Sequence, residues 1–215
     1  MALDALVDST QLDSDLTSVA NAIRTKGGTS AQLAFPAGFV SAVNAISGGS
    51  GNSVFEANDV VMPSSKFSWQ NSLPNVLADG GCIHYKYTLQ ANTNTSNDRA
   101  ILCFGYGALS AWSPGTSNPS AYVNIGKGTS NMTVYLRGVS NVNIYLHDYA
   151  QNGEVDIKLY SDHMFNVKTG NTISYTAAQQ DFFTALAAKS YLSVGCNQSD
   201  PLTGAVITKF ALEDS

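Results

Sequence analysis

The spacing of apolar residues changes once along the chain, from a helical period to a strand period. Near the N-terminus, four apolar residues recur at steps of four, three and four, which places them on one helix face. They are Leu12, Leu16, Val19 and Ile23. Ser9 or Thr10 can cap this helix, and Gly27-Gly28 ends it.

A second short helix is predicted after Pro36, a residue that suits the first turn of a helix. Two short amphipathic helices in fewer than 50 residues cannot bury enough apolar surface alone. Their stripes must pack on each other as an intramolecular hairpin, on copies of the chain, or on a host structure. The residues expected to serve attachment or oligomerisation are Leu12, Leu16, Val19, Ile23, Phe35, Phe39 and Val43.

A Gly/Ser tract without apolar anchors follows the helical region and is typical of a flexible linker. It predicts three segments. Residues 1–47 form a helical attachment and oligomerisation module, residues 48–53 form the linker, and residues 54–215 form the main domain.

Beyond the linker, apolar and polar residues alternate with the period of two that is typical of strands. The predicted strands span residues 83–89, 100–104, 122–125, 132–136, 142–146, 155–159, 172–175, 191–195 and 205–212. Asn152-Gly153 suits the turn of a hairpin between 142–146 and 155–159. A helix is expected over residues 177–189. The pattern predicts a mainly β protein, an antiparallel β-sandwich or jelly roll, with a small N-terminal helical region.

Charge narrows the classes of partner. Only 13% of residues are charged, roughly half the share of about 25% in an average soluble domain. That composition is typical of extracellular β-proteins and virion proteins. The net charge is −5, and the eleven Lys and Arg residues are scattered, so we expect no nucleic-acid partner. Apolar runs never reach the roughly 20 residues that span a bilayer, and no signal peptide is evident, so we expect no membrane insertion.

Two N-terminal stretches stand out, Leu16-Thr17-Ser18-Val19-Ala20-Asn21-Ala22-Ile23-Arg24-Thr25-Lys26 and Phe35-Pro36-Ala37-Gly38-Phe39. Together they resemble a module of tail and other minor structural proteins of phages that infect Gram-positive gut bacteria. In that module, a helix reading L-x-x-V-A-x-A-I-R-x-K precedes an F-P-x-G-F turn and a second short helix. The resemblance covers about the first 46 residues and implies a virion component.

In the rest of the chain, three features follow in order: Ile101-Leu102-Cys103-Phe104-Gly105, then the hairpin with Asn152-Gly153, and the closing strands 191–197 and 204–212. This order resembles the concanavalin-type sandwich of laminin-G-like and legume-lectin-like domains. The resemblance implies that the last strand pairs near the first.

Catalytic patterns are incomplete. Glu154-Val155-Asp156-Ile157 can be compared with sandwich-fold glucanases, whose catalytic strand reads E-x-D-x-(x)-E, but Lys158 follows and no further acid comes after it. Glycoside hydrolysis needs a second carboxylate, so we expect Glu154 and Asp156 on the solvated side of a strand. His84 and His147 are expected on exposed polar faces.

No nucleophile elbow or phosphate-binding loop occurs in the sequence. We therefore expect no catalytic residue, no metal and no cofactor. Cys82, Cys103 and Cys196 form no C-x-x-C pair and are expected to be buried free thiols.

A long loop between two strands is the strongest candidate for ligand binding. Sugar recognition uses aromatic faces together with amide and hydroxyl groups, and residues 106–122 are rich in both. Trp112 is the first choice as a stacking residue, with Tyr106, Asn118 and Tyr122 around it, although Trp112 could instead pin its own loop. A second polar loop holds Asn92, Asn94, Asn97 and Asp98, for which we favour an ordinary solvated turn over a ligand or calcium site.

Together these features predict a virion structural protein of tail-fibre or receptor-binding type. The sandwich would bind host surface carbohydrate without catalysis, and the N-terminal module would join other virion proteins, with a homotrimer as the expected assembly. The alternative is a capsid decoration or head-fibre protein that binds no sugar tightly.

Overall fold

The fold was analysed in a computed structural model, which describes residues 9–27, 34–36, 38–39, 53–62, 70–107, 118–195 and 202–215. Contacts between Cα atoms divide the chain into two compact units, Met1–Ser50 and Gly51–Ser215.

The N-terminal unit contains helix α1, Ser9–Gly27, at the position that the apolar spacing predicts. Its apolar stripe is unevenly buried. Ile23 is buried and Leu16 is half-buried, whereas Leu12 and Val19 are 45% and 48% exposed. Phe35 is 63% exposed, and its ring meets Phe39 edge-on at 5.5 Å between centroids. Of the expected second helix only Gly38 and Phe39 are described, both helical, and Val43 lies outside the described residues.

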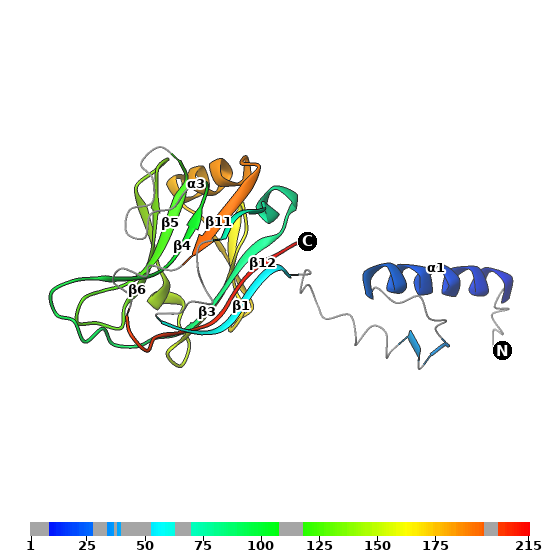
Figure 1. The fold of residues 1–215 in the computed structure, drawn as a ribbon. Helices are drawn as coiled ribbons and strands as arrows, with labels where there is room; N and C mark the ends of the chain where they lie inside the picture. Colours follow the sequence, from blue (N-terminus) through cyan, green and yellow to red (C-terminus); the bar gives the residue numbers. More distant parts are fainter. Residues whose placement is uncertain are drawn as a thin grey trace. The chain divides into compact units, whose positions relative to one another are not determined.

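The second unit is the predicted antiparallel β-sandwich, with six strands in each sheet (Figure 1). In spatial order, the first sheet contains β1 (Ser53–Val61), β12 (Val206–Glu213), β3 (Cys82–Thr88), β8 (Glu154–Leu159), β9 (His163–Asn166) and β10 (Asn171–Ser174). The second sheet contains β2 (Gln70–Pro74), β11 (Tyr191–Gly195), β4 (Arg99–Gly105), β5 (Ser120–Ile125), β6 (Met132–Arg137) and β7 (Val142–Tyr145). Strand β12 pairs with β1, as the concanavalin-type resemblance implies.

Alternation along the strands builds the core between the sheets. In β3 the inward residues are Ile83, Tyr85 and Tyr87, each at most 2% exposed. In β6 the inward residues are Met132, Val134 and Leu136, and polar or aromatic residues stand between them on the outer face. Cys82 and Cys103 are buried and form no disulfide, as predicted, and Cys196 lies outside the described residues.

Helix α3, Ala177–Ala187, matches the predicted internal helix. It begins at a capping box, in which Thr176 and Gln179 each bond the other's backbone N–H. Phe182, Phe183 and Leu186 are its buried residues. The described residues also include two short 3-10 helices, η1 (Val76–Asp79) and η2 (Leu146–Tyr149).

The predicted hairpin between residues 142–146 and 155–159 is wrong in its pairing, although its turn is present. Asn152 and Gly153 have φ angles of 55° and 74°, and the backbones of Gln151 and Glu154 bond each other at 2.9 and 3.0 Å. Strand β7, however, pairs with β6 in the second sheet, and β8 pairs with β3 in the first. Helix η2 lies between β7 and the turn, so the chain changes sheets there. Alternation of apolar and polar residues indicates that each strand has a buried face, but it does not predict which strand pairs with it.

Within the described ranges, no helix is both long enough and apolar enough to cross a lipid bilayer.

Candidate functional site

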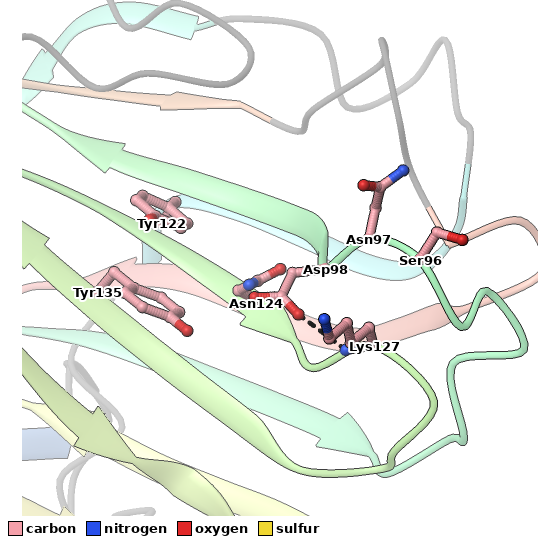
Figure 2. A pocket seen from close by; sticks show the side chains of 7 residues that line it. All are labelled: Ser96, Asn97, Asp98, Tyr122, Asn124, Lys127 and Tyr135. Atoms are coloured by element: carbon pink, nitrogen blue, oxygen red, sulfur yellow. Dashed lines mark hydrogen bonds between the residues drawn. The ribbon is translucent and has the colours of Figure 1, made fainter.

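An open polar pocket of about 400 Å³ lies on the outer face of the second sheet, beside strands β5 and β6 (Figure 2). Its volume falls within the range of about 300–1,000 Å³ that is usual for small-ligand sites. The described lining residues all carry polar or phenolic side chains: Ser96, Asn97, Asp98, Tyr122, Asn124, Lys127 and Tyr135.

Strand alternation places the floor of the pocket. In β5, Ala121, Val123 and Ile125 point into the core, so Tyr122 and Asn124 point outward. Tyr135 is the outward residue directly opposite Tyr122 on β6. The two rings stack, with centroids 4.7 Å apart and planes only 6° apart. Cross-strand aromatic pairs of this kind stabilise a sheet and present a rigid amphipathic surface.

The rim of the pocket comes from the loop before β4, which asparagine side chains hold in shape. Asn92 Oδ1 accepts the backbone N–H of Asn94 at 2.9 Å, and Asn94 Oδ1 accepts those of Ser96 and Asn97 at 2.8 and 3.1 Å. Such bonds between an asparagine and the following backbone fix a turn. The expected solvated turn is therefore a structured loop that brings three residues to the pocket.

Two turns meet at this rim. Asp98 Oδ1 accepts the backbone N–H of Lys127 at 2.8 Å, and the N–H of Gly128 donates to the carbonyl of Asn94 at 3.0 Å. The loop before β4 and the turn between β5 and β6 are thereby joined. The carboxylate of Asp98 therefore has a fixed position at the pocket, which Lys127 also lines.

Asn124 at the floor is only 3% exposed, and its Oδ1 has no hydrogen-bond partner among the described residues. Buried polar atoms in native proteins almost always have a partner. An unpaired buried acceptor costs about 1–3 kcal/mol. A ligand group that donates a hydrogen bond to this oxygen would remove that cost.

The predicted ligand residues do not all gather here. Tyr122 lines the pocket, but Tyr106 packs on Tyr191 at 4.7 Å between centroids, with Lys189 Nζ 4.9 Å from its ring centre. Asn118 lies at a crowded turn, where a β-carbon on Gly138 would collide with its backbone carbonyl. Trp112 lies outside the described residues.

Sequence reasoning missed Tyr135, Asn124 and Lys127. The sequence did offer one signal. In two consecutive predicted strands, apolar residues alternate with outward-facing ones, and Tyr122 and Tyr135 both fall on outward-facing positions. Pairing β5 with β6 was needed to see that the two rings meet.

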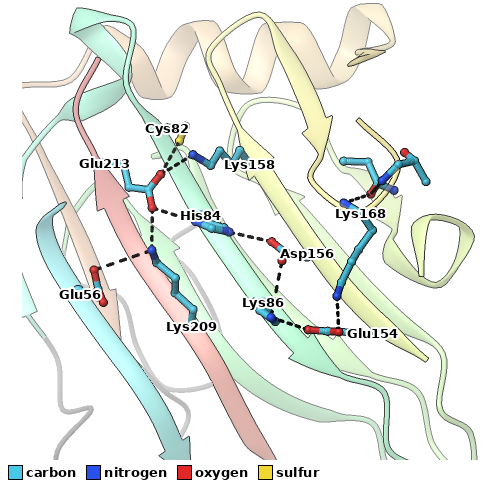
Figure 3. A network of polar contacts seen from close by, with 12 residues as sticks. Glu56, Cys82, His84, Lys86, Glu154, Asp156, Lys158, Lys168, Lys209 and Glu213 are labelled. Atoms are coloured by element: carbon cyan, nitrogen blue, oxygen red, sulfur yellow. Dashed lines mark hydrogen bonds and ion pairs between the residues drawn. The ribbon is translucent and has the colours of Figure 1, made fainter. Parts of the chain in front are cut away.

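A second polar cluster covers the outer face of the first sheet (Figure 3), and we call it the outer ion-pair network. Its members are Glu56, His84, Lys86, Glu154, Asp156, Lys158, Lys168, Lys209 and Glu213. His84 is its centre, since Nδ1 lies 2.9 Å from Glu213 Oε1 and Nε2 lies 2.8 Å from Asp156 Oδ1.

The carboxylates of this network are closely paired with lysines. Lys158 and Lys209 contact Glu213 at 2.8 and 2.9 Å, and Glu154 lies 2.8 Å from Lys86 and 2.6 Å from Lys168. Burial raises the pKa of Glu213, but hydrogen bonds from His84, Lys158 and Lys209 lower it much further, so the net pKa is well below its usual range.

The expectation of solvated acids and exposed histidines on this face is wrong for two residues. Asp156 is buried, with 7% of its surface exposed, and His84 is half-buried between two carboxylates. Glu154, by contrast, is only partly covered. The reason is that side chains from β3, β8 and β12 pair across strands, which single-strand alternation does not predict.

In the parts of the chain with described positions, no three His, Cys, Asp or Glu side chains gather as a metal site. Comparison of the chain with family models, with curated proteins and with solved structures finds no match.

Proposed function

We propose that this chain is a non-catalytic carbohydrate-binding protein of a virion, of receptor-binding type, which recognises host surface glycans with the outer face of its second sheet. The observation that carries the proposal is the pocket, where the stacked Tyr122–Tyr135 pair lies beside the buried, unpaired Asn124 Oδ1.

The chemistry of the lining suits a hydroxylated, uncharged ligand. Tyrosine rings offer an apolar surface for C–H groups, while amides, hydroxyls and a carboxylate offer donors and acceptors for ligand hydroxyls. Among the described lining residues, Asp98 and Lys127 carry one negative and one positive charge, so the pocket favours neither anions nor cations strongly. None of these residues is aliphatic, which disfavours a purely apolar ligand.

Two observations support a binding role over glycoside hydrolysis. Hydrolysis needs two carboxyl groups at the scissile bond, one of them a protonated acid with a raised pKa. The described pocket lining contains one carboxylate, Asp98. In the outer ion-pair network, where several carboxylates do gather, hydrogen bonds from Lys168 and Lys86 lower the pKa of Glu154, and Glu213 is also held in its charged form.

The virion assignment and the homotrimer rest on the N-terminal resemblance and on the exposure of α1. Leu12 and Val19 are about half exposed although they occupy the predicted seam, and Phe35 is exposed as well. Apolar residues at alternating steps of four and three suit knobs-into-holes packing between helices. We propose that these residues contact other copies of the chain or other virion proteins.

Sugar binding is tested with full-length protein on an array of bacterial wall glycans. We expect selective binding that weakens about twofold to tenfold in Tyr122→Ala, because an aromatic contact contributes about 0.5–1.5 kcal/mol. Tyr145→Ala is the matched control, since Tyr145 is an outward tyrosine of β7, 51% exposed, that does not line the pocket. Flat binding by the wild type, or equal loss in both variants, would contradict the proposal. Flat binding together with a location on the capsid would favour the decoration alternative.

Assembly is tested separately by measuring mass in solution. The double variant Leu12→Gln/Val19→Gln keeps helix propensity while it removes two exposed apolar groups. We expect a trimer for the wild type and a smaller species for the variant. Thr17→Gln, at an exposed polar position of the same helix, is the control. A monomeric wild type would refute the oligomerisation role.

A further inference from the structure

Arg137 contacts the tyrosine pair of the pocket but is not among the described residues that line the pocket. It is the outward residue of β6 two positions after Tyr135, and its guanidinium carbon lies 4.8 Å from the ring centre of Tyr135 and 5.9 Å from that of Tyr122. A guanidinium within about 6 Å of an aromatic ring centre is attracted to the ring face. One cation therefore contacts both rings of the pair.

The same guanidinium is hydrogen-bonded to its own strand and to the neighbouring strand β7. Arg137 Nη1 donates to the carbonyl of Leu136 at 2.8 Å, to the carbonyl of Val142 at 3.0 Å and to Oδ1 of Asn143 at 3.3 Å. Val142 and Asn143 begin β7, the edge strand of the second sheet. The guanidinium thus has a position fixed by backbone groups of two strands, independently of the rings.

These two sets of contacts give Arg137 a distinct role. We propose that Arg137 is the positioning residue of the carbohydrate site, holding the Tyr122–Tyr135 stack in the orientation that meets the ligand. The inference rests on the proposed function. Arg137 itself is absent from the described pocket lining, so its effect on binding passes through the two rings.

Arginine is suited to this role because its planar fork can stack on rings and donate several hydrogen bonds at once. A lysine at position 137 would keep the positive charge, but its single ammonium could not match both sets of contacts. A glutamine would lose the attraction to the rings. The three side chains should therefore give a graded series.

The experiment compares full-length wild type with Arg137→Lys and Arg137→Gln. Glucose, galactose, rhamnose and N-acetylglucosamine are titrated one at a time by saturation-transfer NMR. Near-ultraviolet circular dichroism records the order of the tyrosines without ligand. We expect Arg137→Gln to weaken sugar binding by about threefold to thirtyfold and to reduce the tyrosine signal, with Arg137→Lys in between.

Lys189→Gln is the matched control, because Lys189 Nζ also lies over a tyrosine ring, that of Tyr106, which is not among the described lining residues. It should change neither the affinity nor the signal of the stacked pair. If Arg137→Gln unfolds, Asn143→Ala provides a second variant, since it removes one acceptor of the guanidinium and leaves β6 intact.

Unchanged affinity in Arg137→Gln and in Asn143→Ala, with sugar binding intact in the wild type, would overturn the positioning role alone. If the wild type bound none of the four sugars, the proposed function would fail, and with it the role of Arg137 in binding. The dichroism signal would then still decide whether Arg137 orders the tyrosine pair.

Discussion

Replacement of His84 by alanine is the sharpest test of the outer ion-pair network. The imidazole bridges Glu213 and Asp156 through both nitrogens, at 2.9 and 2.8 Å. Two ionised carboxylates can both be satisfied only if both ring nitrogens donate, which requires the charged imidazolium. Burial lowers the pKa of His84, but the hydrogen bonds with Asp156 and Glu213 together raise it by more than burial lowers it. The net pKa therefore lies above its ordinary 6.5.

The size of the stability loss depends on which ion-pair partners Asp156 and Glu213 retain without the imidazole. The side chains of His84, Asp156 and Glu213 are only 12%, 9% and 2% exposed, and breaking such a buried pair typically costs about 3–5 kcal/mol. After the change, Glu213 retains both close lysines, but among the described residues Asp156 retains only the ion pair with Lys86 at 3.9 Å. We therefore expect His84→Ala to lose about 2–4 kcal/mol of unfolding free energy.

The sign of the pH dependence is fixed by the raised pKa. A group with a higher pKa in the folded state contributes its full stability below the unfolded value of 6.5, and this contribution disappears as pH rises through the folded pKa. The difference between wild type and His84→Ala should therefore be larger at about pH 5.5 than at about pH 9. Cys82, beside Glu213, has a pKa raised by burial to about 11, so its thiol stays protonated across this window.

Urea unfolding at both pH values measures these differences. His163→Ala is the control, because His163 pairs with Asp162 at 2.6 Å, where the aspartate side chain is 74% exposed. Exposed pairs contribute only about 0–1 kcal/mol. A loss of stability in His84→Ala that is equal at both pH values, or larger at high pH, would refute a charged His84.

Two further predictions concern the second sheet. Asn124→Leu should raise the unfolding free energy by about 1–3 kcal/mol, because it removes a buried acceptor without a described partner. The same variant should abolish sugar binding, and denaturation and glycan titration of one sample check both results. A less stable variant would contradict the account of Asn124. Gly138→Ala should destabilise the fold by more than about 1 kcal/mol, because φ is 92° and the new β-carbon would collide with the backbone of Asn118. Gly128→Ala, at φ 62° with open space around it, should cost less, and equal melting temperatures for the two glycine variants would count against the collision.

Much of the fold could be predicted because local patterns were strong. The strand at residues 191–195 and the helix that begins at Ala177 appear where the sequence places them. Strand β9 was missed, since His163–Asn166 offers only four residues and one buried apolar side chain, Met164. The pairing of β8 was wrong because its partner, β3, lies some 70 residues earlier in the chain, at His84↔Lys158 for instance.

The candidate site was predicted only in part, for a related physical reason. Tyr122 was chosen for its place in a loop, yet strand pairing sets it directly opposite Tyr135. Asp98 lines the same pocket, where its carboxylate accepts the backbone N–H of Lys127. Each of these neighbours is polar or aromatic and common in the chain, so none stands out alone. Only the register of β5 with β6 and the folded loop before β4 bring them to one place.

The two outer faces of the sandwich differ in how far their polar groups are already satisfied, and this difference decides where a ligand would bind. On the first sheet, the carboxylates of Glu154 and Glu213 each have two close lysine partners, so a ligand would have to displace ion pairs. On the second sheet, Asn124 Oδ1 has no described partner, and the pocket above it is open. A ligand hydroxyl that donates a hydrogen bond to Asn124 Oδ1 would replace no existing bond among the described residues. On the second sheet, the cost of removing the Asn124 oxygen from water was already incurred when the protein folded. Binding to the first sheet would add a new desolvation cost, so binding to the second sheet is favoured.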